Sequence, residues 1–191
     1  METVLPPPRF TAPDPDALTD AARRVYEATR AGRRGTVPAN VLAWLPSPEL
    51  AQRAQHLGAF LRYDTSLGPR SSELAILVVA RHWSSAYEWA IHAGEAARAG
   101  LGEAAIAALG AGRRPDLDGP AEEAVYDVAT ELVAGAGLAD ATFARAEAAL
   151  GRQALVELVG LVGYYTMVAM TLNAFEVPVP EGAPALPPLR R

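Results

Sequence analysis

The stretch from Leu155 to Leu172 constrains the fold of this 191-residue chain more than any other. Its eighteen residues are almost all apolar, Glu157 is the one charged side chain among them, and Asn173 lies just beyond. A membrane-spanning helix needs about 20 apolar residues and usually has basic flanks. We therefore interpret this stretch as a helix that is buried in a protein core or a subunit interface, and we expect no membrane span.

Helix signals continue along most of the remaining chain. Ala, Leu, Arg and Glu are abundant and favour helices. Ser47-Pro48-Glu49 reads as an N-cap followed by proline at the first helical position. Leu74 to Ala80 is an apolar run that could be a buried strand in isolation, but no second such run exists, so we predict a buried helix. The sequence predicts an all-α bundle of seven or eight helices. They are expected over residues 16–31, 36–45, 48–67, 71–99 with a break near residues 83–85, 102–109, 120–132, 140–150 and 153–175.

Proline marks both ends of the chain. Residues 1–15 carry five prolines and are expected to form an extended arm. Residues 16–176 are predicted to form one helical domain, since a chain of this length is normally a single domain. Residues 177–191 are again rich in proline and are expected to lie extended along the surface.

Composition excludes several classes of function. The chain has no cysteine, which rules out disulfides, thiolate metal sites and thiol redox chemistry. Its net charge is −5 and its arginines are scattered, so no basic face predicts nucleic-acid binding. The first fifteen residues lack the basic and apolar regions of a signal peptide. We expect a cytoplasmic protein whose partners are small molecules or copies of itself.

A cluster of polar residues follows the buried run. Ser85, Glu88 and His92 lie within about 60° of one another on a helix, so they share one face. Glu73 opens the apolar run itself. A carboxylate, an imidazole and a hydroxyl on one face can exchange protons. Two alternatives remain. Glu88 and His92 could form an ordinary exposed pair, and Glu73 could only supply a favourable negative charge at a helix N-terminus.

A metal site is a further alternative at this cluster. Glu88 and His92 could supply two ligands, with Glu73 or His82 as a third. The His-Glu-x-x-His zinc signature is absent, however. We predict no metal and no organic cofactor.

The segment from Glu73 to His92 resembles the core motif of the carboxymuconolactone decarboxylase and alkylhydroperoxidase D-like superfamily. In its peroxidase branch, a Glu is followed after twelve residues by Cys, after three more by a second Cys, and after four more by His. The same offsets fall on Glu73, Ser85, Glu88 and His92 here. The Tyr-Glu-Trp-x-x-His wording is typical of the thiol-less branch, and the resemblance extends over about residues 36–182.

The resemblance implies a fold, an activity and an assembly. It implies a helical alkylhydroperoxidase D-like fold and a homotrimer, or a hexamer of trimers. It also implies a cofactor-free lyase of the decarboxylase kind that acts on a small carboxylated lactone or related acid in aromatic compound metabolism. A dehydratase, isomerase, hydrolase or non-catalytic binding protein remains an alternative. By analogy His92 and Glu88 act as acid and base, Glu73 tunes His92, and Ser85 donates to a substrate oxygen. The residues expected to bind substrate are Arg81, Tyr87, Trp89, Tyr164 and Tyr165.

Overall fold

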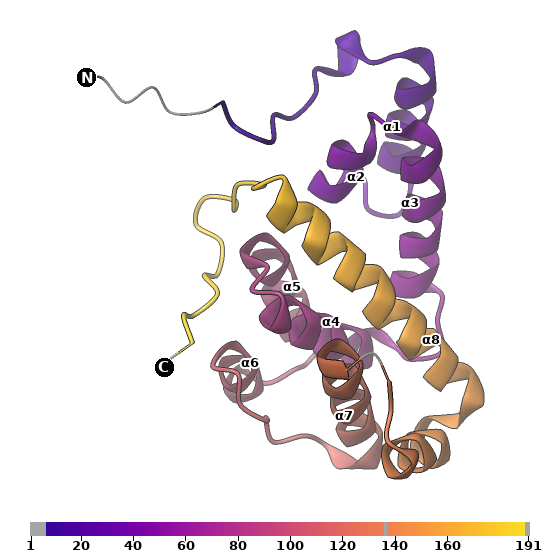
Figure 1. The fold of residues 1–191 in the computed structure, drawn as a ribbon, viewed down its shortest axis with the longest axis vertical. Coiled ribbons are helices and arrows are strands. Elements are labelled where there is room, and N and C mark those ends of the chain that lie inside the picture. The colour runs from indigo at the N-terminus through magenta and orange to yellow at the C-terminus, as the bar shows by residue number, and fades with distance from the viewer. Residues whose placement is uncertain (1–6, 136, 190–191) are drawn as a thin grey trace.

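Eight α-helices make up the computed structural model of the chain, which describes residues 7–135 and 137–189 (Figure 1). The described residues contain no β-strand, so the predicted all-α class is confirmed. In chain order the helices are α1 (Asp20–Ala31), α2 (Ala39–Trp44), α3 (Pro48–Tyr63), α4 (Pro69–His82), α5 (Ala86–Arg98), α6 (Glu103–Gly110), α7 (Gly119–Gly135) and α8 (Asp140–Ala174).

The first helix begins later than its sequence pattern predicted. Pro15–Ala17 forms a short 3-10 helix, which the side chain of Asp14 caps by accepting from the backbone N–H of Asp16. α1 starts only at Asp20, where the Thr19 hydroxyl accepts from the N–H of Ala22. Both caps satisfy N–H groups that have no partner within a helix, and they set the boundary that apolar spacing alone could not fix.

The last helix lies at the centre of the molecule. α8 packs against α7, α4, α2, α3 and α5. Leu158 and Leu161 are fully buried, whereas Val156 and Val159 face outward. α8 is long and apolar enough to cross a membrane by length and composition, but just over half of its most apolar window is buried inside the protein. The prediction of a core helix over this stretch is confirmed.

Gly151 divides α8 into two parts. Its backbone has φ 79° and ψ 162°, which is not helical, while helix continues on both sides. A positive φ of this size is accessible to glycine at low cost and is rare for other residues. The break agrees with the prediction of separate helices over residues 140–150 and 153–175.

The apolar run near the middle of the chain forms α4, the helix that places the candidate site inside the protein. Every residue from Ser72 to Ala80 is buried, which confirms the predicted buried helix. A tight turn links α4 to α5, with Ser84 at φ 50° and the N–H of Ser85 donating to the carbonyl of Ala80 over 2.9 Å. This turn brings the buried face of α5, which carries Glu88 and His92, alongside Glu73.

Candidate active site

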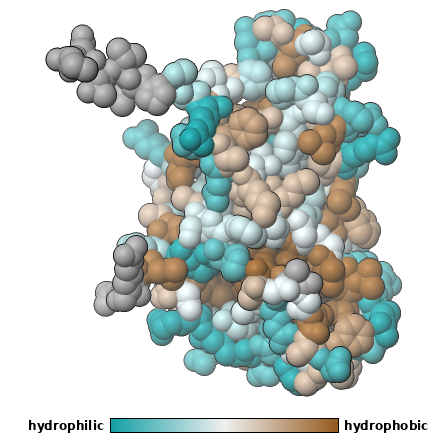
Figure 2. Space-filling view, viewed as in Figure 1, coloured by the Kyte–Doolittle hydropathy of each residue, from teal (hydrophilic) through white to brown (hydrophobic). Residues whose placement is uncertain are grey.

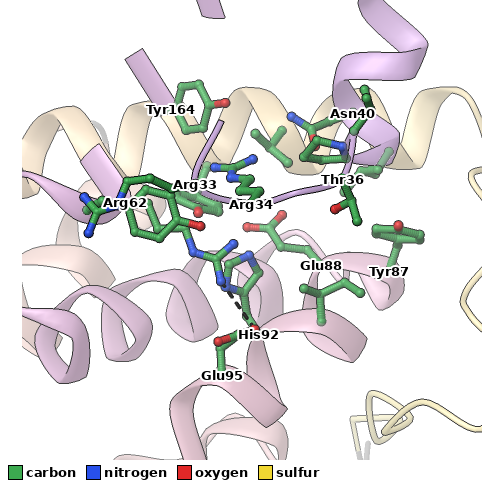
Figure 3. A pocket seen from close by; sticks show the side chains of 17 residues that line it. Arg33, Arg34, Thr36, Asn40, Arg62, Tyr87, Glu88, His92, Glu95 and Tyr164 are labelled. Atoms are coloured by element: carbon green, nitrogen blue, oxygen red, sulfur yellow. Dashed lines mark ion pairs between the residues drawn. The ribbon is translucent and has the colours of Figure 1, made fainter. Parts of the chain in front are cut away.

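A cavity of about 410 Å³ lies next to the buried polar cluster. Its walls come from the loop between α1 and α2, the start of α2, the end of α3, and the facing sides of α5 and α8. In Figure 3 the carboxyl group of Glu88 points toward the loop that carries Arg33, Arg34 and Thr36. The cavity therefore has an acidic and imidazole-bearing wall on α5 and a basic wall on the loop.

His92 and Glu73 form a buried pair beside this cavity. The Nδ1 atom of His92 lies 2.7 Å from an oxygen of Glu73, and the two side chains are only 7% exposed. A carboxylate can only accept a hydrogen bond, so the pair fixes a proton on Nδ1. Tyr165 packs against the imidazole of His92, with an angle of 89° between the two rings and 5.1 Å between their centroids. This arrangement leaves Nε2 as the nitrogen that can exchange a proton with a substrate.

Glu88 has a different environment from Glu73. It is fully buried, it lines the cavity, and neither of its oxygens has a hydrogen-bond partner among the described residues. Burial raises the pKa of the Glu88 carboxyl well above its usual value; the nearby Ser85 hydroxyl opposes the rise only in part, and the negative charge of Glu73 adds to it. Burial therefore favours the neutral form of the Glu88 carboxyl, which can donate a proton.

Three arginines line the basic part of the cavity. Arg33 pairs with Asp64 over 2.8 Å. Arg62 lies 3.8 Å from Glu73 and 3.6 Å from Glu95, and only 15% of its side chain is exposed. Arg34 donates to the carbonyl of Gly58 over a long 3.5 Å contact. These groups give the cavity a polar rim suited to an anionic ligand.

Two tyrosines of α8 complete the cavity. The rings of Tyr164 and Tyr165 stand edge to face with centroids 5.4 Å apart, and burial raises the pKa of both hydroxyls. Tyr164 occupies a notch at Gly58, where an added Cβ would come within 2.1 Å of the tyrosine oxygen. Gly58 on α3 therefore permits the position of Tyr164.

The structure brings most of the predicted site residues together. Tyr87, Glu88, His92, Tyr164 and Tyr165 line the cavity. Glu73 lies behind His92 and contacts it directly. Ser85 is buried at the start of α5 and does not line the cavity, which argues against its predicted contact with a substrate oxygen.

Two predicted substrate-binding residues lie elsewhere. Arg81 donates to the carbonyls of Gly110 and Pro187 and to the Ser84 hydroxyl, so it fastens the C-terminal tail. Trp89 packs against Gly110, because one residue beyond Glu88 is a rotation of about 100° around the helix. Neither residue lines the cavity.

Sequence reasoning missed the basic wall. The Arg33–Arg34 pair lies in the loop between α1 and α2, and the scattered arginines of the sequence do not indicate that this pair lines a cavity. Sequence reasoning also missed Glu95, an acidic residue that lines the cavity. Glu95 follows His92 by three residues on the same helix face, and this spacing could have identified it. No comparable signal links Arg62 to Glu73, because their contact depends on how α3 packs beside α4.

A metal site gains no support from the packing. The described residues contain no group of three His, Cys, Asp or Glu side chains that could hold a metal ion. His82, the alternative third ligand, lies at the end of α4 with its ring against Trp83 and outside the cavity.

Comparisons with known proteins find a matching family for part of the sequence and a similar fold for nearly all of it. Residues 48–131, from α3 into α7, match the carboxymuconolactone decarboxylase family. A solved structure described as an uncharacterized peroxidase-related protein from Silicibacter sp. superposes with a TM-score of 0.74. It is 16% identical and the superposition covers 95% of this chain and 96% of that one, so it shows the fold. No curated protein matches the sequence. This chain is therefore similar to the carboxymuconolactone decarboxylase family over residues 48–131, and it shares its fold with the peroxidase-related protein.

Proposed function

We propose that this protein is a cofactor-independent, lyase-like enzyme that moves protons on a small carboxylated lactone or related acid. The observation that carries the proposal is the presence of a hydrogen-bonded Glu73–His92 pair and a fully buried Glu88 at one cavity. One group can accept a proton while the other donates one, which is the requirement for general acid/base catalysis.

Each residue has a distinct part in this proposal. His92 uses Nε2 to take a proton from a carbon or oxygen of the substrate, and the Glu73 carboxylate stabilises the imidazolium that forms. Glu88 gives its proton to the oxygen or carbon that gains electrons. In a decarboxylation, the pair of electrons from the broken C–C bond moves toward that oxygen as CO₂ leaves, and the proton from Glu88 neutralises it.

Thiol peroxidase chemistry is the function that the neighbour's description would suggest. It requires a cysteine nucleophile, and this chain has none. Ser85 and Glu88 occupy the positions of the two thiols in the peroxidase motif. We therefore expect the purified protein to give no thiol-dependent turnover of organic peroxides.

A dehydratase, isomerase or hydrolase could use the same three groups. The rim favours an anionic substrate through Arg34, which supports the carboxylated lactone or acid over a neutral compound. The net reaction is then distinguished by its product, since only a decarboxylation releases CO₂.

The test follows proton transfer and CO₂ release together. Purified protein is incubated in D₂O with a panel of lactone acids, deuterium incorporation is followed by NMR, and headspace CO₂ is measured. We expect protein-dependent deuterium incorporation that His92→Ala abolishes. CO₂ release would assign a decarboxylase, and incorporation without CO₂ would assign an isomerase-type reaction. Absence of both across the panel would contradict the proposal.

We also propose that the protein is a cytoplasmic homotrimer, or a hexamer of trimers. Figure 2 shows apolar side chains on the side of the molecule where α3 and α8 run. The exposed apolar side chains of these two helices include Leu57 and Phe60 on α3, and Val156 and Val159 on α8. Such a patch on a soluble protein commonly marks an interface. Light scattering of the wild type and of a Val156→Glu variant tests this: a trimer or hexamer that dissociates on substitution is expected, and a wild-type monomer at micromolar concentration contradicts it.

A further inference from the structure

The charges around the cavity are almost all compensated by other protein charges. Arg33 has Asp64, and Arg62 shares the carboxylates of Glu73 and Glu95. Glu95 is in turn bonded to Arg98 over 2.7 Å. These pairs hold their charges in place and leave little charge for a ligand to neutralise.

Arg34 is the exception. In the part of the chain that the structure describes, no carboxylate lies within 4.0 Å of its guanidinium. Its recorded contacts are the carbonyl of Gly58 at 3.5 Å and the ring of Tyr63, with 5.9 Å between the guanidinium carbon and the ring centroid. A guanidinium has five N–H donors in a planar fork, so most of them remain available to an anion at the cavity.

Three of the six buried side-chain polar atoms that lack partners among the described residues lie at the same cavity. Both oxygens of Glu88 and the hydroxyl of Tyr164 are buried without a geometrically acceptable hydrogen-bond partner among the described residues. Buried polar groups are rarely left unpaired, because each one costs free energy. These three atoms and the free guanidinium of Arg34 indicate that a ligand in the cavity supplies their missing hydrogen-bond partners.

We propose that the substrate is a monocarboxylate, with its carboxylate paired to Arg34 and a second oxygen accepting a hydrogen bond from Glu88. The inference rests on the acid/base function proposed above and adds the charge and orientation of the molecule that is bound. A single uncompensated cation matches a single negative charge. A second carboxylate would find no second uncompensated arginine among the described residues that line the cavity.

The position of Arg34 makes it a specificity-determining residue. It lies in the loop between α1 and α2, outside residues 48–131 that match the family. Relatives with the same α4–α5 motif therefore need not bind the same acid. Arginine suits this task because its fork can bind both oxygens of one carboxylate.

Binding to probe ligands tests the proposal separately from catalysis. Titration calorimetry would compare the monoanions benzoate and levulinate with the neutral amides benzamide and levulinamide and with the dianions phthalate and succinate. We expect the monoanions to bind wild type at least about tenfold more tightly than either other class. Arg34→Gln should weaken monoanion binding by about tenfold or more and remove the preference over the amides, because a hydrogen bond to a charged group is lost.

Two further variants serve as controls. Arg34→Lys should recover part of the affinity, since it keeps the charge and loses the fork. Arg30→Gln removes one exposed charge from α1 away from the cavity and should leave affinity within about twofold. Circular dichroism verifies that all variants are folded.

The outcomes separate this inference from the proposed function. Equal affinity for amides, monoanions and dianions, no detectable binding of either monoanion, or full binding by Arg34→Gln would overturn the inference. Selective monoanion binding without any deuterium incorporation or CO₂ release would leave the inference standing and contradict the catalytic proposal.

Discussion

On one side of the cavity, α5 presents Glu88 and His92, backed by Glu73 of α4, all inside the segment that matches the family. On the other side, the loop between α1 and α2 presents Arg33 and Arg34, which lie outside that segment. The first wall is buried and carries the groups that we propose transfer protons, and the second is polar and carries the arginine that we propose contacts the ligand. Under these proposals, chemistry and substrate choice reside in different parts of the chain.

The largest expected effect is on the proton-transfer wall. His92→Ala should reduce turnover by roughly 10²–10⁴-fold, the usual loss when a positioned acid/base group is removed. Helicity and oligomeric state should be nearly unchanged. His56→Ala is the matched control, because His56 lies on α3 and does not line the cavity. Full activity of the His92 variant would show that this wall is not catalytic.

Glu88→Gln should be nearly as severe, with a loss of about 10²-fold or more, because it keeps the shape and removes the proton that can be donated.

The same change, Glu88→Gln, should stabilise the folded protein. The pKa of the Glu88 carboxyl is higher in the folded protein than in the unfolded chain. At a pH between these two pKa values, the folded state therefore binds more protons than the unfolded state. Stability of the wild type should therefore fall as pH rises above about 4.5.

Urea unfolding near neutral pH measures this effect. Glu88→Gln should be more stable than wild type by roughly 1–3 kcal/mol, because it escapes the cost of protonating a carboxyl at that pH. The advantage should shrink as pH is lowered toward 4.5. A variant that is less stable than wild type at every pH would indicate that Glu88 is an ordinary structural group.

Glu73→Gln should have a smaller effect than His92→Ala, about 10–100-fold in turnover, since it removes a hydrogen bond to a charged group and leaves the imidazole in place. Glu73 is a positioning residue, so its role has a second readout. Nitrogen NMR of His92 should show the proton fixed on Nδ1 in wild type and a mixture of tautomers in the variant. An unchanged tautomer would mean that Glu73 does not orient the ring.

The two walls also differ in how far the sequence could predict them. The motif offsets predicted that Glu73, Glu88 and His92 lie together, as they do in the structure, because spacing along two consecutive helices fixes which side chains meet. The ligand-binding wall joins a loop, α3 and α8, which lie far apart in the sequence, and no local pattern encodes their packing. Arg81 shows the same limit: it lies near the motif in sequence, yet it contacts Pro187 of the tail.

The smallest expected effects concern the position of Tyr164 at the ligand-binding side. Gly58→Ala should destabilise the protein by about 1–3 kcal/mol, because the new Cβ would lie 2.1 Å from the Tyr164 oxygen and overpack the notch. Gly94→Ala on α5 is the control. Its Cβ would meet only the end of Arg98 at 3.7 Å, so helix propensity should stabilise it by roughly 0.5–1 kcal/mol. Equal effects of the two changes in urea unfolding would contradict the role of Gly58.

The protonation state of Glu88 is the most direct test of the proton-transfer wall, and it requires no substrate. Carboxyl-carbon NMR of protein labelled at its glutamate side chains, assigned by comparison with Glu88→Gln, follows this group across the pH range. The account predicts that the Glu88 signal keeps the position of a protonated acid at neutral pH, because burial raises its pKa well above the usual 4.5. A Glu88 signal that titrates near pH 4.5 and is fully ionised at neutral pH would contradict the account.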